Sequence, residues 1–287
     1  MTIAFLTLGC KLNYAETSTY ERGFRQAGLE VVSWKDKADI YLVNTCSVTA
    51  TSDGKSRNLI RKVHRINPEA RIIVTGCSAE LRRSELEKIE GVSRVFGASE
   101  KARVVAETLG LPLDEAALSP VFGAYSTGER TRSFLKVQDG CNNFCKYCTV
   151  PFARGESRNL PICQCVRNAR LIAAEGVKEI VLTGVNTGDF GRTTGESFLD
   201  LLKAQNEVDG IERYRISSIE PNLISEEIID WIASGTKFQP HFHIPLQTGS
   251  DLQLERMGRH YDCDFFERKI AYIREKMEGD GKPKVFF

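Results

Sequence analysis

Three cysteines stand close together in the middle of the chain, at a spacing that suits metal chemistry. Cys141, Cys145 and Cys148 form the pattern C-x3-C-x2-C directly after an apolar stretch at residues 134–138. So short a loop can turn three thiolates toward one centre, where they can hold three irons of a [4Fe–4S] cluster and leave the fourth without a protein ligand. An open metal position can bind a substrate or cofactor directly. The spacing therefore predicts a redox enzyme.

A structural zinc ion is the alternative for this loop. Structural zinc takes four protein ligands, so it would need one more beside the three thiolates. Cys163 and Cys165 are the nearest candidates, but both stand where the next helix is expected to begin. The iron–sulfur interpretation needs no fourth thiolate and is preferred.

A second set of cysteines is dispersed along the sequence but shares one local setting. Cys10, Cys46 and Cys77 each follow a predicted strand and precede a predicted helix. In an open parallel sheet the carboxyl ends of the strands lie along one edge, where ligands bind. Gly9 and Gly76 precede two of these cysteines and leave room beside the backbone for a bulky inorganic group. The three thiols can therefore converge, although burial in the core is the other common fate of free cysteine.

Composition limits the class of protein. The 287 residues suffice for two domains, and 27% charged with 41% hydrophobic residues is typical of a soluble globular chain. A formal net charge of +1 excludes a globally basic surface, so nucleic-acid contact would need a local patch. The first apolar run, residues 3–8, is too short for a signal peptide or membrane span. With nine cysteines and no sign of export, we expect a cytoplasmic protein with reduced thiols and no membrane contact.

The N-terminal third of the chain must position the second cysteine set. Apolar strands that alternate with helices predict a parallel sheet covered on both faces. We therefore expect an α/β doubly wound domain at residues 1–110. The strands are expected at residues 3–8, 31–34, 40–43, 72–75 and 94–96, and the helices at residues 15–26, 53–66 and 80–90.

The rest of the chain must position the cysteine loop. Residues 111–132 are rich in Pro, Gly, Ser and Thr and read as a linker. Residues 133–287 repeat strand and helix, which predicts a partial TIM-type (βα) barrel. The series ends inside an apolar stretch at residues 284–287, so we expect a truncated barrel. Its strands are expected at residues 134–138, 180–183, 214–217 and 241–246, and its helices at 163–174, 197–205, 225–234 and 264–277.

The cysteine loop resembles the signature of radical S-adenosylmethionine (radical SAM) enzymes. In that family the open iron binds SAM, and the reduced cluster splits it to give a 5′-deoxyadenosyl radical. The resemblance implies that Tyr147, just before the third cysteine, packs near the adenine. It also implies a barrel of six (βα) units.

The whole chain resembles the methylthiotransferases within that family. These carry a second [4Fe–4S] cluster on three N-terminal cysteines, and Cys10, Cys46 and Cys77 fall on those positions. The resemblance implies that one cluster makes the radical, the auxiliary cluster delivers sulfur to an unactivated carbon, and SAM also supplies the methyl group.

The stretch TLGCKLNYAET at residues 7–17 is similar to one branch of this family. That branch, the MtaB type, acts on C2 of N6-threonylcarbamoyladenosine at position 37 of tRNA. The alternatives are a branch acting on isopentenyladenosine at the same position and one acting on a ribosomal protein. An alternative of another class is a cluster-binding family fragment without catalytic activity.

Polar residues at the strand ends of the barrel are candidate SAM contacts, because catalytic groups gather there. They are Asn186, Glu220 and Gln247, although Asn186 could equally be a turn residue. Arg154 and Arg158 follow the loop and could hold the SAM carboxylate or a tRNA phosphate. Pairing with Glu156 is the alternative for them. Cys163, Cys165 and Cys263 have no evident partners and are interpreted as incidental.

One predicted helix carries a run of basic residues. A solvated helix face is the ordinary explanation, but the run is also the first candidate for contact with the tRNA backbone. The resemblance implies an anticodon-loop substrate and an electron donor such as flavodoxin or ferredoxin. Family members usually carry a C-terminal RNA-binding β-barrel, which we expect to be absent from this chain. We expect a monomer.

The basic residues of the predicted helix are Lys55, Arg57, Arg61, Lys62 and Arg65.

Overall fold

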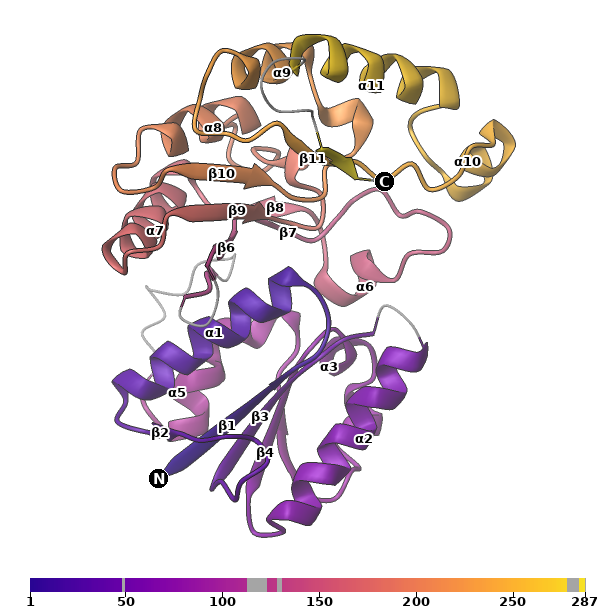
Figure 1. Ribbon diagram of the computed structural model, residues 1–287. Coiled ribbons are helices and arrows are strands. Elements are labelled where there is room, and N and C mark those ends of the chain that lie inside the picture. Colours follow the sequence, from indigo (N-terminus) through magenta and orange to yellow (C-terminus); the bar gives the residue numbers. More distant parts are fainter. Residues whose placement is uncertain (48–49, 113–122, 128–130, 278–283, 287) are drawn as a thin grey trace. The chain divides into compact units, whose positions relative to one another are not determined.

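The computed structural model describes residues 1–47, 50–112, 123–127, 131–277 and 284–286 (Figure 1). The chain forms two compact units. Unit 1 comprises Met1–Ser126 and Phe152–Gly155, and unit 2 comprises Thr127–Pro151 and Glu156–Phe287. Most of the predicted linker, residues 111–132, lies outside the described residues.

Unit 1 is built on a five-stranded sheet in which every neighbouring pair is parallel. The strand order β2-β1-β3-β4-β5 is that of a doubly wound fold, with a switch point between β1 and β3. Its strands are β1 (Thr2–Thr7), β2 (Glu30–Val31), β3 (Ile40–Thr45), β4 (Arg71–Gly76) and β5 (Val92–Val95).

Helices cover both faces of this sheet (Figure 1). Ile60 and Val63 of α2 (Ala50–Ile66) pack with Tyr41 on one face, where α3 (Cys77–Leu81) and α4 (Arg83–Leu86) also lie. Tyr20 and Phe24 of α1 (Lys11–Gln26) pack on the other face, where η1 (Ala98–Arg103) is followed by α5 (Val104–Leu109). All six residues of β3 are buried, which explains why its sequence is continuously apolar up to Asn44.

Unit 2 contains successive (βα) units. Three parallel strands form a sheet in the order β10-β9-β6, a bridge from Tyr214 to Phe238 extends it, and β11 pairs in parallel with β12. This is a partial barrel of the predicted kind. Its strands are β6 (Ser133–Lys136), β9 (Glu179–Thr183), β10 (Arg213–Ile216), β11 (His241–His243) and β12 (Lys284–Phe286).

Helices follow these strands in turn. The longer ones are α7 (Ile162–Ala174), α8 (Phe198–Asn206), α9 (Glu226–Ala233) and α11 (Cys263–Met277). Shorter elements flank the cysteine loop and lie near the later strands. These are β7 (Gln138–Asp139), α6 (Val150–Arg154), β8 (Arg158–Asn159), η3 (Thr187–Asp189), η4 (Pro221–Leu223) and α10 (Asp251–Met257).

The structure corrects several predicted elements. The helix expected at residues 80–90 is two short helices, because the chain leaves helical geometry at Arg82, whose φ is −136°. The strand expected at residues 31–34 pairs only at Glu30–Val31, and that at residues 241–246 only at His241–His243. The helices α6 and α10 and the segment from η1 to α5 were not predicted from the sequence.

No helix among the described residues is both long enough and apolar enough to cross a membrane.

Candidate functional site

The cysteine loop of unit 2 begins directly after β7. Gly140 has a φ of 71° and Phe144 a φ of 45°. Both residues therefore adopt left-handed backbone conformations, which let the chain fold back on itself. The Cys148 amide donates to the Cys145 carbonyl at 2.9 Å. The Lys146 amide donates to the carbonyl of Met257 at the end of α10, at 3.1 Å. Hydrogen bonds therefore close the loop internally and connect it to α10, a helix that was not predicted from the sequence.

The three thiols of this loop influence one another electrostatically. Burial is the main cause that raises the pKa of Cys141, and negative charge on Cys145 and Cys148 acts in the same direction. Burial likewise raises the pKa of Cys145, although the nearby Arg259 opposes this. A metal bound to neighbouring cysteines stabilises their thiolate forms.

A polar cluster surrounds the loop and contains four of the predicted SAM contacts. Arg259 Nη1 donates to Glu220 Oε1 at 2.6 Å, and Arg259 Nη2 also contacts the Tyr147 hydroxyl. The Tyr147 hydroxyl donates to Gln247 Oε1 at 3.1 Å. The Glu220 amide donates to Asn186 Oδ1 at 3.2 Å. Tyr147, Asn186, Glu220 and Gln247 therefore form one connected cluster beside the cysteines, which we call the unit 2 polar cluster.

Arg259 belongs to this cluster and was not predicted. It follows α10 and lies 112 residues beyond Tyr147 in the sequence, with no motif that marks it. The predicted contact Arg158 lies near the start of the loop: its Nη2 is 3.7 Å from Oδ2 of Asp139, which stands two residues before Cys141, and its Nη1 donates to the Glu156 carbonyl at 3.0 Å.

In unit 1, the second cysteine set lies at the ends of three adjacent strands. Cys46 and Cys77 directly follow Thr45 and Gly76, which are register partners on β3 and β4. Cys10 is the N-cap residue of α1, just beyond β1. The sequence pattern had predicted this common edge.

Two glycines allow close approach at this edge. A Cβ on Gly9 would lie 3.1 Å from the Cys46 sulfur, so the backbone before Cys10 passes directly beside that thiol. A Cβ on Gly76 would lie 2.3 Å from the Thr45 carbonyl oxygen, and the φ of Gly76 is 97°. No larger residue fits the backbone that delivers Cys77 to this edge.

Buried charges lie behind these cysteines. Glu16 Oε1 accepts hydrogen bonds from Lys101 Nζ at 2.9 Å and from Arg154 Nη1 at 3.2 Å. The three side chains are at most 3% exposed. Arg154 Nη2 also donates to Asn13 Oδ1, an oxygen that lies 4.0 Å from the Cys10 sulfur. From the sequence, Arg154 is a candidate for binding a SAM carboxylate or a phosphate. The structure assigns its guanidinium instead to Glu16 and Asn13 of unit 1.

The donor chemistry of both cysteine sets fits an iron–sulfur cluster. Thiolates are the usual ligands of [4Fe–4S] clusters, and each set offers three. Within the described residues, no group of three His, Cys, Asp or Glu side chains is already arranged around a single metal ion.

The remaining cysteines stand apart from these sets. Cys165 is fully buried, and its pKa is raised chiefly by that burial. The pKa of Cys263 is raised to about 11, mainly by a hydrogen bond with Asp251. Cys163 is exposed on α7.

The basic residues of α2 do not form one uniform surface. Lys55, Arg61, Lys62 and Arg65 are exposed, whereas Arg57 is half-buried and lies 3.9 Å from Glu85. The Lys62 ammonium stands over the Trp34 ring, 4.8 Å from its centroid. A hollow of about 620 Å³ adjoins this surface. It is lined by Arg61, His64, Arg65, Glu85, Lys88, Ile89 and Glu90.

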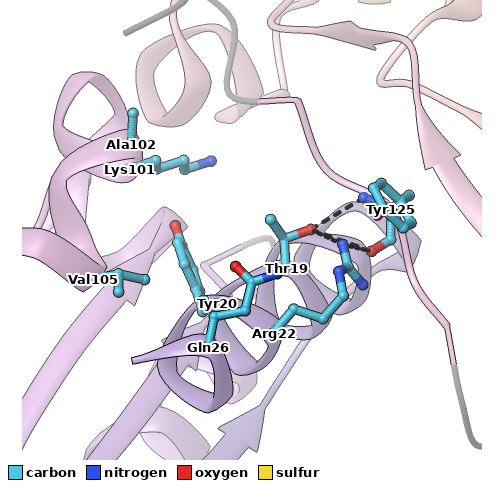
Figure 2. A pocket seen from close by; sticks show the side chains of 9 residues that line it. Thr19, Tyr20, Arg22, Gln26, Lys101, Ala102, Val105 and Tyr125 are labelled. Atoms are coloured by element: carbon cyan, nitrogen blue, oxygen red, sulfur yellow. Dashed lines mark hydrogen bonds between the residues drawn. The ribbon is translucent and has the colours of Figure 1, made fainter. Parts of the chain in front are cut away.

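A smaller pocket of about 300 Å³ lies between α1 and η1 in unit 1 (Figure 2). Thr19 and Arg22 hold Tyr125 at its rim: the Arg22 Nη2 donates to the Tyr125 carbonyl at 2.9 Å, and the Tyr125 amide donates to the Thr19 hydroxyl at 3.1 Å. Lys101 lines the pocket, so the buried pair that it forms with Glu16 borders this space.

Two family models cover most of the chain. Residues 2–97 match the uncharacterized protein family UPF0004, and residues 135–281 match the radical SAM superfamily. A methylthiotransferase from Aquifex aeolicus is 37% identical over 96% of this chain and 70% of its own length. The chain belongs to the radical SAM methylthiotransferase family. Membership in the superfamily implies SAM and a [4Fe–4S] cluster as cofactors.

Curated relatives carry two kinds of name. The Aquifex aeolicus protein and one from Bacillus subtilis, 37% identical over 97% of this chain and 64% of the relative, are named threonylcarbamoyladenosine tRNA methylthiotransferase MtaB. A Syntrophomonas wolfei protein, 32% identical over 96% of this chain and 65% of the relative, is named tRNA-2-methylthio-N(6)-dimethylallyladenosine synthase. The chain spans about two thirds of the length of these relatives.

Solved structures share the fold. The radical S-adenosylmethionine methyltransferase TsrM from Kitasatospora setae superposes with a TM-score of 0.64 at 16% identity, over 96% of this chain and 66% of that one. The cobalamin-dependent S-adenosylmethionine radical enzyme OxsB superposes with a TM-score of 0.60 at 12% identity, over 95% of this chain and 47% of that one. At these identities the likeness concerns the fold alone.

Proposed function

We propose that this protein is a tRNA methylthiotransferase that modifies C2 of N6-threonylcarbamoyladenosine at position 37. One observation carries the proposal: a chain with the C-x3-C-x2-C loop also gathers Cys10, Cys46 and Cys77 at one edge of a parallel sheet. A radical enzyme that only cleaved SAM would need one set of thiolates. A second set is what sulfur transfer requires.

Each cysteine set has its own task in this proposal. Cys141, Cys145 and Cys148 hold the cluster that binds SAM and supplies radical chemistry when reduced. Cys10, Cys46 and Cys77 hold an auxiliary [4Fe–4S] cluster from which sulfur is delivered.

The unit 2 polar cluster orients SAM. Burial of Glu220 and Arg259 keeps their charges in a medium where electrostatic contacts are stronger than in water. Glu220 and Asn186 offer acceptors for donor groups of SAM, and Gln247 holds the Tyr147 hydroxyl. Tyr147 is half exposed, so its ring is available to pack against the adenine.

The exposed basic residues of α2 supply backbone contacts for the tRNA. Lys55, Arg61 and Arg65 can each neutralise a phosphate. This contact carries no sequence information, so recognition of the modified adenosine depends on other groups.

Iron content tests the chemical part of the proposal. Anaerobic reconstitution should give about eight irons per chain, four for each cluster. Replacing Cys10, Cys46 and Cys77 with alanine should leave about four. An iron content near four in the unchanged protein would contradict the proposed auxiliary cluster. Zinc in place of iron would contradict the proposal that the protein is a radical SAM enzyme.

Nucleoside mass spectrometry tests the substrate. A strain without the gene should accumulate N6-threonylcarbamoyladenosine that lacks its methylthio group, and the restored gene should return the product. The Syntrophomonas wolfei relative makes the isopentenyl series the relevant alternative. If only that series changes, the substrate assignment is wrong.

A further inference from the structure

The auxiliary cysteines have buried cations behind them, and these cations share one carboxylate. Arg154 is 2% exposed, Lys101 3% and Glu16 0%. Taken alone, this trio carries one more positive than negative charge. Such charges act strongly on their neighbours, because the protein interior screens them less than water does.

The trio is connected to the thiols by Asn13. The side-chain oxygen Oδ1 of Asn13 accepts from Arg154 Nη2 and lies 4.0 Å from the Cys10 sulfur. The side-chain nitrogen Nδ2 of Asn13 donates to the carbonyl of Leu8, just after β1, at 2.8 Å and to that of Thr45, the last residue of β3, at 2.9 Å. Asn13 is fully buried, and hydrogen bonds are stronger in the protein interior than in water.

We infer that Arg154, Lys101 and Glu16 together set the reduction potential of the cluster held by Cys10, Cys46 and Cys77, with the cations favouring its reduced form and the carboxylate opposing it. The inference rests on the proposed auxiliary cluster. A cluster that gains one electron gains one negative charge, which nearby buried cations stabilise and a nearby carboxylate destabilises. These are positioning and charge-tuning residues: Arg154 reaches the cysteine edge through Asn13, and Lys101 pairs with Glu16.

The test uses the full chain with Cys141, Cys145 and Cys148 replaced by alanine, so that only the unit 1 site can hold a cluster. Dithionite supplies one electron, which converts [4Fe–4S]²⁺ to [4Fe–4S]⁺ with no bond made or broken. The reduced form is counted by electron paramagnetic resonance against the solution potential.

We expect opposite shifts from opposite charges. Arg154→Gln should make the reduced form about tenfold less populated at a fixed potential, a shift of about 59 mV for one electron. Glu16→Gln should shift the potential in the opposite direction, and Arg154→Lys, which keeps the charge, should stay near the unchanged protein. Arg94→Gln is the matched control, because Arg94 pairs with Glu107 at 3.0 Å on the surface of the same unit.

A merely structural role would not give shifts of opposite sign. Equal potentials in all variants, or shifts of Arg154→Gln and Glu16→Gln in the same direction, would overturn the inference. If Arg154→Gln does not fold, Glu16→Gln and Arg154→Lys still decide it. If the alanine background itself takes up no iron, the auxiliary cluster and this inference fail together, and that result is distinct from an unchanged potential in a loaded protein.

Discussion

The guanidinium of Arg259 and the carboxylate of Glu220 form a buried ion pair beside the cysteine loop, with Nη1 and Oε1 2.6 Å apart. Their side chains are only 7% and 9% exposed. Within the described part of the chain, Glu220 Oε2 and Arg259 Nε are buried without a hydrogen-bond partner. An acceptor and a donor therefore remain for a polar ligand at this position, because buried polar groups are rarely left unsatisfied.

Arg259→Gln should weaken SAM binding and destabilise unit 2. Removing one partner of a buried ion pair typically costs about 3–5 kcal/mol, since the other charge stays buried and uncompensated. Part of this cost should appear as a SAM dissociation constant at least about tenfold higher. Equilibrium dialysis of reconstituted protein and urea unfolding measure the two effects. Arg256→Gln, an exposed change on α10, is the control. Equal SAM affinity in the two variants would contradict the assignment.

Gly76→Ala should destabilise unit 1 at the sheet edge that carries Cys10, Cys46 and Cys77. The added Cβ would meet the Thr45 carbonyl oxygen at 2.3 Å, and the φ of 97° is strained for any residue with a side chain. We expect a loss of about 3 kcal/mol or more in the free energy of unfolding. Gly28→Ala has a similar φ of 84° but nothing within 4 Å, so it should lose only about 1 kcal/mol. Urea unfolding of the metal-free proteins compares them, and equal losses would refute the steric argument.

Glu179 should make the stability of unit 2 depend on pH. Burial alone would raise its pKa, but hydrogen bonds from Arg215 and Arg213 and the charge of Arg132 lower it below its ordinary value of 4.5. The ionised carboxylate therefore stabilises the fold fully above the unfolded pKa, and this stability is lost as the pH falls through the lower, folded pKa.

Glu179→Gln should accordingly reduce the free energy of unfolding by about 2 kcal/mol at pH 7 and flatten its dependence on pH in the acid range. Urea unfolding at a series of pH values measures both effects. Glu212→Gln is the matched control, because the Glu212 side chain is 57% exposed and its partners are also Lys and Arg. An identical pH profile for Glu179→Gln and the unchanged protein would show that the arginine contacts contribute no net stability.

The α2 surface should be visible in the salt dependence of tRNA binding. Replacing Arg61 and Arg65 with glutamine should weaken binding and reduce the slope of log affinity against log salt by about 1 to 2, since each lost phosphate contact reduces it by slightly less than one. Filter binding at several salt concentrations measures the slope. Arg94→Gln is an exposed control on the same unit. Unchanged affinity and slope in the double variant would remove this surface from the tRNA interface.

The three cysteines outside the two sets should be dispensable for metal. Replacing Cys163, Cys165 and Cys263 with alanine should leave the iron content unchanged, because none of them belongs to either group of thiols. Iron analysis after anaerobic reconstitution measures this. A loss of about four irons would mean that one of these thiols is a cluster ligand.

The sequence alone determined the parts of this protein that depend on local pattern. The loop cysteines lie within eight consecutive residues, so their spacing already limits how they can fold. The doubly wound sheet followed from apolar strands that alternate with helices, because strands buried on both faces need continuous apolar runs. Cys10, Cys46 and Cys77 could be related to one another since each repeats the same strand-end position.

Only the tertiary structure decided which distant charged residues are buried together. In sequence, Glu16, Lys101, Arg154 and Arg259 look like ordinary helix or loop residues. Their burial depends on partners 39 to 138 positions away, and no local periodicity records such a pairing. The tertiary structure also decided that two short helices replace the predicted one: the backbone leaves helical geometry at Arg82, and Ala79 and Leu86 on either side of it lie in the same core. The burial of these charges is set by contacts between residues distant in sequence. The spacing of the loop thiols and the apolar character of the strands are local properties of the sequence.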